Sequence, residues 1–282
     1  MRFAILLVIA LVLVSGCSIT GKPIIDKGSD CDSLIGSLPE IIAENQERAV
    51  SVARIVDGDT IELANGDTVR FIGINTPEKD FRFYSEAKSL TKELTVGGVY
   101  LARDEVDKDQ YNRLLRYVFT EDTFVNAELV RQGYAVVYEV PPNTKYASLL
   151  RCVQEDAKQN HRGIWGMQSL NNYSVSLEVN YDAPGNDLEN LNGEFVKITN
   201  TGELDVWMED WIIKDQARHT YKFGTILLKP GETLTLYTGA GSDDAIKKEL
   251  YWYSEEPIWN NDGDTAFLFD SNGYVVTETS FP

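Results

Sequence analysis

A carboxylate and a guanidinium are predicted to meet on one face of a short β-hairpin. The Asn65-Gly66 pair lies between two runs of alternating apolar and polar residues, which is a strong signal for a two-residue hairpin turn. With that turn Ile61 lies opposite Arg70, and directly paired residues point to the same face of a sheet. Because side chains alternate along a strand, Asp59 shares that face with Arg70.

A stiff turn follows the second strand of this hairpin. In Asn75-Thr76-Pro77-Glu78 the proline fixes its own φ and restricts the residue before it. The turn can therefore aim the Thr76 carbonyl and the Glu78 carboxylate back towards Asp59.

Hydrolysis of a phosphodiester bond requires groups of this kind. Oxygen atoms of Asp59, Asn75 and the Thr76 carbonyl suit a hard cation such as Ca²⁺. Glu78 is a candidate for accepting a proton from the attacking water. A planar guanidinium such as that of Arg70 binds phosphate oxygens in pairs and stabilises the charge of the transition state.

A second arginine and three tyrosines are further candidates. Arg113 follows the polar loop 107–112 and could bind phosphate, and Tyr111 beside it could stack on a base or donate a hydrogen bond. Tyr84 and Tyr138 are candidates for nucleotide contact as well. The alternative interpretation is a surface salt bridge for Arg70, a structural role for Arg113, and a place in the core or at its rim for Tyr84 and Tyr138.

In order and spacing these motifs resemble those of the staphylococcal nuclease (thermonuclease-like) family over about 120 residues. The matching segments are Val56-Asp57-Gly58-Asp59-Thr60, Val69 to Glu78, Tyr84-Ser85-Glu86-Ala87, Asp109 to Arg113, Asn126 to Gly133 and Gly163-Ile164-Trp165. The resemblance implies a five-stranded OB-fold barrel with three helices. It also implies calcium-dependent endonuclease and exonuclease activity on DNA and RNA, with products that carry a 3′-phosphate.

By motif, the resemblance makes Asp59 a calcium ligand, Glu78 the proposed general base, and Arg70 and Arg113 the groups that hold phosphate. Asn75 stands where the family's best-known pattern has an aspartate. An amide oxygen can still bind calcium, but one negative charge is missing, so we expect weaker calcium affinity. The alternative function is a catalytically silent surface module that binds nucleic acid or protein.

The four residues of the first motif recur near the other end of the chain. Asp262-Gly263-Asp264-Thr265 has neither an arginine-bearing strand nor a Thr-Pro-Glu turn after it, and we interpret it as a plain turn. The larger set of residues therefore carries the specificity of the prediction.

Periodicity and turn residues predict the elements that must position the site. We expect strands at 52–56, 60–63, 68–74, 99–103, 114–119 and 134–138, and helices at 85–94, 125–132 and 145–160. Ser85 is expected to cap the first of these helices.

The C-terminal part has a different pattern of apolar and turn residues. Residues 175–282 consist of short alternating runs between Gly, Pro, Asn and Asp turns, with one short helix expected at 243–249, which is typical of an all-β sandwich. Gly193 to Gly202 and Trp259-Asn260-Asn261 resemble the lamin-tail domain. That resemblance implies an immunoglobulin-like sandwich that binds or positions, and the sequence names no ligand for it.

The N-terminus predicts export. Arg2, an apolar run and Ser15-Gly16-Cys17 indicate a signal peptide over 1–16, and they resemble a lipobox that would place a lipid on Cys17. The protein is then anchored by that lipid to the outer face of the membrane; the alternative is an ordinary secretory signal. We expect a lipid-anchored tether with one helix over 17–46, the nuclease-like domain over 47–167, a linker over 168–174 and the second domain over 175–282.

Cysteines and charge limit the remaining possibilities. Export permits a disulfide between Cys31 and Cys152, but sequence does not show whether their Cα atoms are close enough. Two histidines and no CxxC pair argue against a zinc site. The formal charge of −18 lies mainly in residues 173–282, where 7 basic residues face 20 acidic ones. This acidity argues against duplex binding through the second domain. The sequence indicates no oligomeric state.

Overall fold

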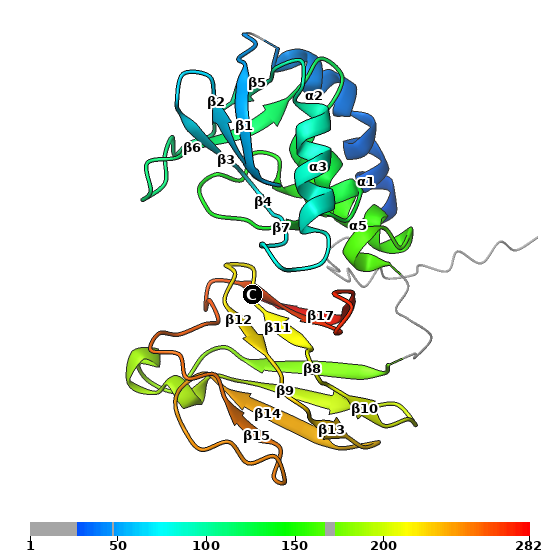
Figure 1. Cartoon of the computed structure of the whole chain (residues 1–282), viewed down its shortest axis with the longest axis vertical. Coiled ribbons are helices and arrows are strands. Elements are labelled where there is room, and N and C mark those ends of the chain that lie inside the picture. The colour runs from blue at the N-terminus through cyan, green and yellow to red at the C-terminus, as the bar shows by residue number, and fades with distance from the viewer. Residues whose placement is uncertain (1–26, 47, 167–172) are drawn as a thin grey trace, which may run out of the picture.

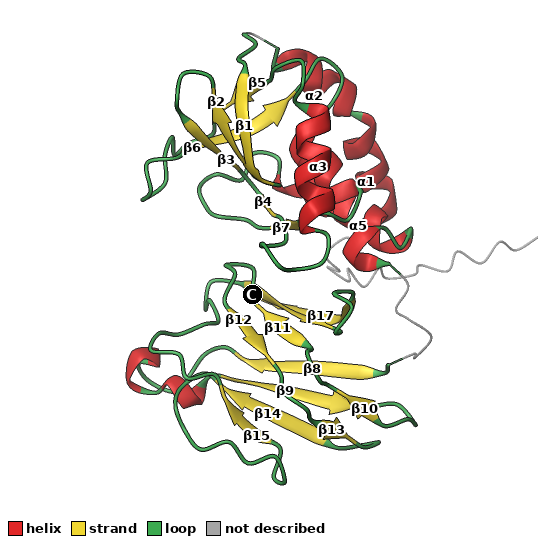
Figure 2. Ribbon diagram, viewed as in Figure 1, coloured by secondary structure: helices red, strands yellow, loops and turns green. Residues whose placement is uncertain are grey.

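The computed structural model describes residues 27–46, 48–166 and 173–282, and it consists of two β-rich domains stacked end to end (Figure 1). Helices cover one side of the first domain, whereas the second is built of strands (Figure 2). The signal peptide, Cys17 and most of the linker lie outside the described residues and stay predictions. No helix of the described ranges is both long and apolar enough to span a membrane.

The first domain is built on a five-stranded sheet. Its strands, in spatial order, are β1 (Val52–Asp57), β2 (Thr60–Leu63), β3 (Thr68–Phe71), β6 (Leu114–Phe119) and β5 (Tyr100–Ala102). A bridge between Val50 and Val99 joins the two edges of this sheet. Gly73, with φ of +78°, ends β3 early, so that β4 (Ile74–Asn75) leaves the sheet and pairs with β7 (Val136–Val137). The mainly β, OB-fold prediction is confirmed.

Five helices accompany the sheet. The expected three are α3 (Tyr84–Leu94), α4 (Val125–Arg131) and α5 (Ala147–Gln159). Ser85 does not cap α3, because the helix begins one residue earlier and Phe83, with φ of +65°, occupies the cap position. Residues expected in the tether instead form α1 (Lys27–Gly36) and α2 (Leu38–Glu44) on the same core. A disulfide between Cys31 and Cys152, with Cα atoms 5.2 Å apart, ties α1 to α5.

The register of the first hairpin differs from the prediction by one residue. Ile61 pairs with Val69, and Arg70 pairs with Thr60. The Leu63 amide donates to the Asp67 carbonyl, so the loop holds three residues and Gly66 adopts φ of +90°. Glycine in the left-handed region is the usual third residue of such a loop. The predicted Ile61–Arg70 pairing is therefore wrong.

The second domain is a sandwich of two four-stranded sheets, as predicted. One sheet contains β15 (Glu249–Tyr251), β14 (Thr233–Tyr237), β9 (Phe195–Asn200) and β8 (Val175–Asn180). The other contains β12 (Thr220–Lys222), β11 (Ile212–Lys214), β16 (Asp264–Phe269) and β17 (Val275–Phe281), and β10 (Val206–Trp207) pairs with β13 (Leu227–Leu228). Short 3₁₀ turns occupy 187–189 and 191–193 of this domain, and another occupies 163–165 at the end of the first domain. The helix expected at 243–249 is absent there, because turns close a bridge between Asp244 and Glu249.

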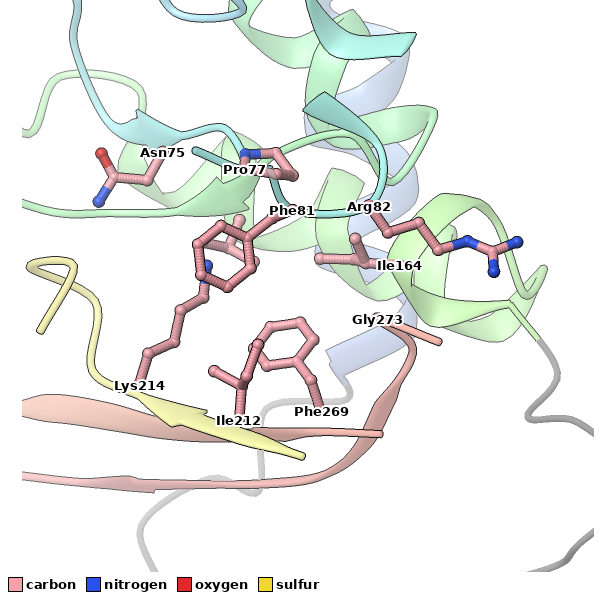
Figure 3. Close-up of a pocket in the computed structure, with 10 residues that line it drawn as sticks. Asn75, Pro77, Phe81, Arg82, Ile164, Ile212, Lys214, Phe269 and Gly273 are labelled. Carbon is pink, nitrogen blue, oxygen red and sulfur yellow. The ribbon is translucent and has the colours of Figure 1, made fainter. Parts of the chain in front are cut away.

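The two domains share an apolar cluster. Ile164 and Trp165 of the first domain pack with Phe267 and Phe269 of the second. Figure 3 shows part of this interface, with Ile164 and Phe269 facing each other across a small pocket. Burial of such surface stabilises the docked arrangement.

Polar contacts frame this cluster. Arg82 donates to Tyr274 Oη at 2.6 Å and to the Asn272 carbonyl, and Lys158 pairs with Glu278. The docked interface holds the β11–β12 hairpin, whose loop is 215–219, against the first domain (Figure 1).

Candidate active site

Asp59 lies at the centre of the site and is fully buried in the turn between β1 and β2. Its Oδ2 accepts hydrogen bonds from the Thr76 amide at 2.9 Å and the Thr76 hydroxyl at 3.1 Å, and its Oδ1 accepts one from Thr60. Gly58 permits this approach, since a Cβ there would lie 2.8 Å from Thr76 Cγ2. The structure thus brings the Thr-Pro-Glu turn onto Asp59.

Arg70 reaches the same carboxylate despite the changed register. Its Nη2 lies 3.4 Å from Asp59 Oδ2, and the side chain is buried. The guanidinium also donates to the Phe71 and Ile74 carbonyls and to Asn75 Oδ1. In this conformation Arg70 therefore holds the ends of β3 and β4 together and directs the Asn75 oxygen towards itself.

Arg218 of the second domain enters the site from the β11–β12 loop. Its Nη2 donates to Asp59 Oδ2 at 2.8 Å, and its Nη1 pairs with Glu78 Oε1 at 2.5 Å. The adjacent Gln216 carbonyl accepts a hydrogen bond from Asn75 Nδ2. One guanidinium thus bridges the predicted calcium ligand and the predicted general base.

Burial and neighbouring charges shift the pKa values of buried Asp59 and half-buried Asp57 in opposite directions. Burial alone would raise the pKa of Asp59, but Arg70, Arg218 and the hydrogen bonds from Thr76 hold it below its usual value. Burial and the neighbouring Asp59 raise the pKa of Asp57. Asp57 Oδ1 is also buried without a hydrogen-bond partner. These carboxylates are crowded in a way that a cation relieves.

A pocket of about 640 Å³ opens beside these groups. It is lined by Arg70, Tyr111, Arg113 and Tyr138, together with Ala217 and Arg218 from the second domain. Arg113 lies next to the Tyr111 ring, and its Nε donates to Asp109 Oδ2 at 2.6 Å. The predicted arginine and two of the predicted tyrosines therefore come together at the mouth of the site.

Tyr84 lies elsewhere. It begins α3 and lines a separate groove with Lys88, whose ammonium group donates to the Val56 carbonyl. The structure does not place Tyr84 at the pocket that holds Arg113, because α3 turns its first residue towards β1.

The donor set fits a hard cation in kind but not in its present arrangement. Carboxylate and amide oxygens of Asp57, Asp59, Glu78 and Asn75 are the ligands that calcium prefers. Within the described ranges, however, no three His, Cys, Asp or Glu side chains are grouped to hold a metal ion. Arg218 lies between Asp59 and Glu78, and Asn75 is turned to Arg70.

Sequence reasoning missed Arg218 and Gln216, although one signal was present. Arg218 is the only arginine between residues 173 and 282, a strongly acidic segment. Composition marks the residue as unusual, but it does not identify the carboxylates that the residue meets.

Comparison with known proteins assigns each domain to a family. The family model described as Staphylococcal nuclease homologue matches residues 68–167, and the one described as Lamin Tail Domain matches 169–282. Thermonuclease of Staphylococcus intermedius is 36% identical over 124 residues, which cover 40% of this chain and 74% of that protein. The chain belongs to the staphylococcal nuclease family. Its first domain is a phosphodiesterase nuclease domain, and its second is a lamin tail domain.

Two further proteins contain a segment similar to the nuclease domain. Endonuclease YncB of Bacillus subtilis is 38% identical over 137 residues, which cover 44% of this chain and 65% of that protein. Endonuclease YhcR of the same organism is 34% identical over 134 residues, 11% of its own length. A nuclease domain of this family therefore occurs in proteins of different lengths.

Proposed function

We propose that this protein is an exported, calcium-dependent nuclease that hydrolyses DNA and RNA and leaves 3′-phosphate ends. One observation carries the proposal. Asp59 and Glu78 lie close enough for a single guanidinium to bridge them, with Arg70 beside Asp59. A carboxylate for a cation, a base for water and an arginine for phosphate are thus within reach of one phosphodiester.

Each group has a stated task in the proposed reaction. Arg113 and Arg70 donate to the phosphate oxygens and position the phosphorus atom. Glu78 accepts the proton of the attacking water as the new P–O bond forms. The bond from phosphorus to the 5′ oxygen breaks, this oxygen leaves as a hydroxyl group with a proton from solvent water, and the phosphate stays on the 3′ side. Asp59, Asn75 and Thr76 would hold calcium, which supplies positive charge to the phosphate oxygens when bound.

Hydrolysis of single-stranded DNA and RNA by the full chain tests this function. We expect cleavage with calcium, loss of cleavage with a chelator, and products that require phosphatase treatment before their 3′ ends can be extended. Glu78→Ala and Arg113→Ala should each lower the rate on the order of a hundredfold or more, the scale of removing one group that stabilises a transition state. His161→Gln, at the surface end of α5, is the control variant.

Two results would contradict the assignment. Cleavage that persists in the chelator removes the calcium dependence, and near-normal rates in both variants remove the site. A chain that binds nucleic acid without cleaving it would instead be a binding module.

We also propose that the protein is exported and anchored to the outer face of the membrane by a lipid on Cys17. The disulfide between Cys31 and Cys152 supports export, since disulfides persist in oxidising compartments. Incorporation of a labelled fatty acid, abolished in Cys17→Ser, tests the anchor. An unlabelled protein in the culture medium would favour the ordinary secretory signal.

A further inference from the structure

The loop between β11 and β12 is built to hold one side chain inside the nuclease site. Asp215 accepts hydrogen bonds from the amide and ring nitrogen of His219, which closes the loop at its base. The Gln216 amide donates to Asp264 Oδ1, and its carbonyl accepts from Asn75. The loop is thus fixed to its own sheet on one side and to the nuclease domain on the other.

Arg218 itself has a backbone conformation that favours glycine. Its φ is +91°, in the left-handed region, where side chains other than those of Gly, Asn and Asp are uncommon. A conformation of this kind is strained and persists where the surroundings determine it. The ion pairs with Asp59 and Glu78 are the interactions that hold the residue there.

We propose that Arg218 is an intramolecular occupant of the cation position, through which the lamin tail domain holds the nuclease site in an inactive state. The proposal deepens the function proposed above and rests on it. In the docked state the guanidinium occupies Asp59 Oδ2, an oxygen that a calcium ion would take, and it also pairs with the proposed base, Glu78. Calcium and Arg218 therefore exclude each other.

Charge strengthens this exclusion. The carboxyl groups of Asp57, Asp59 and Glu78 all lie near Arg218, around a site that already contains Arg70. Arg218 places a further positive charge where a calcium ion would have to enter. Because Asp59 is fully buried, this repulsion is screened by water less than it would be at the surface.

The same contact disables the proposed chemistry. Glu78 Oε1 is paired with Arg218, so this oxygen is already occupied where an attacking water molecule would have to reach it. Ala217 and Arg218 also line the pocket in which Arg113 and Tyr138 would meet the nucleotide. Docking of the second domain therefore affects the cation, the base and the substrate pocket together.

Release requires only the loop or the domain to move. The Arg218 side chain is 31% exposed, so water and ions reach its outer end. By linkage, calcium that binds only the released state must weaken docking by the factor by which docking weakens calcium binding. The negative charge of the second domain would then repel the nucleic acid less when that domain has moved away.

Calcium binding measured by isothermal titration calorimetry, without nucleic acid, tests the proposal. Arg218→Gln removes the charge, and Arg218→Lys keeps a charge but lacks the two guanidinium nitrogens that contact Asp59 and Glu78. Lys222→Gln removes an exposed charge from the same hairpin. We expect Arg218→Gln to bind calcium on the order of tenfold tighter than the unmodified chain, within the ~5–150-fold range of couplings between sites. Arg218→Lys should lie between, and Lys222→Gln should match the unmodified chain.

Hydrogen exchange gives a second measurement that needs no variant. Calcium should accelerate exchange of the amides of the 215–219 loop, which loses its contacts with Asn75, Asp59 and Glu78 on release. Amides of β9, in the middle of the other sheet, are the internal control.

The outcomes separate the two proposals. If the unmodified chain cleaves with calcium but Arg218→Gln binds calcium no more tightly, the inhibitory role of Arg218 is overturned while the nuclease function stands. A loss of cleavage in Arg218→Gln at saturating calcium would make Arg218 a catalytic cation instead. If neither protein binds calcium, both proposals fall.

Discussion

The chain contains the same four residues, Asp-Gly-Asp-Thr, in two turns that hold opposite ends of one loop. In the nuclease domain, Asp59 accepts a hydrogen bond from the guanidinium of Arg218. In the lamin tail domain, Asp264 accepts hydrogen bonds from the backbone amides of Gln216 and Thr265. Both aspartates are buried at the start of a strand. The local sequence therefore builds a similar turn twice, and its partners decide what the carboxylate does.

The two carboxylates respond oppositely to burial. Burial and the nearby Asp215 raise the pKa of Asp264, because only backbone amides compensate it. The pKa of Asp59 is lowered, because two arginines outweigh the effect of burial. A buried carboxylate held ionised by side-chain cations can exchange those cations for a metal ion, whereas one held by amides is fixed in a structural role.

Substitution of each aspartate by asparagine should show the largest difference between the two turns. We expect Asp59→Asn to lower calcium-dependent cleavage on the order of a hundredfold or more, since it removes the charge that binds the cation. Asp264→Asn should retain cleavage within a few fold. Initial rates on single-stranded DNA at saturating calcium measure both. Equal losses in the two variants would show that the second turn also serves catalysis.

Asn75 offers a smaller change in the same site. Asn75→Asp restores a charge among the predicted ligands, and it loses the amide that donates to the Gln216 carbonyl. Both effects should favour calcium over the Arg218 loop, so we expect calcium binding to tighten on the order of tenfold. Calorimetry measures this shift. Unchanged affinity would mean that the position is not a ligand.

Local patterns predicted the strands and helices of the nuclease domain but not the pairing of its first hairpin. Asn65-Gly66 marked the turn correctly. The loop nevertheless takes in Ala64, and Arg70 pairs one residue away from its expected position. Two-residue and three-residue loops share this turn signal, and a shift of one residue changes the face of every side chain. Arg70 still reaches Asp59, because a long side chain spans the difference.

Long-range contacts were beyond the sequence patterns. The convergence of Asp59 and Thr76 was predictable because one hairpin and one stiff turn connect them. The contact between Asp59 and Arg218 depends on how two domains dock, and no periodicity records that arrangement. α1 was likewise read as part of a tether, since its apolar residues acquire a partner only when Cys31 meets Cys152.

Protonation of His219 should produce the smallest of these effects, in the loop that joins the two turns. Its hydrogen bond to Asp215 raises the pKa of His219 above the usual 6.5, with further contributions from Asp264 and Glu256. The ionised pair therefore stabilises the hairpin fully below about pH 6.5, and this stabilisation is lost as the pH rises through the folded-state pKa. The His219 side chain is 47% exposed, so water screens the pair and the effect is modest.

Proton NMR titration of the two histidines measures this shift directly, and His161→Gln assigns the resonances. The free energy of unfolding should fall in the unmodified chain relative to His219→Gln as the pH rises from 6.5. A His219 pKa at or below 6.5 would show that Asp215 binds only the backbone amide. The loop would then depend on Gln216 and Arg218 alone, and the two Asp-Gly-Asp-Thr turns would be its main supports.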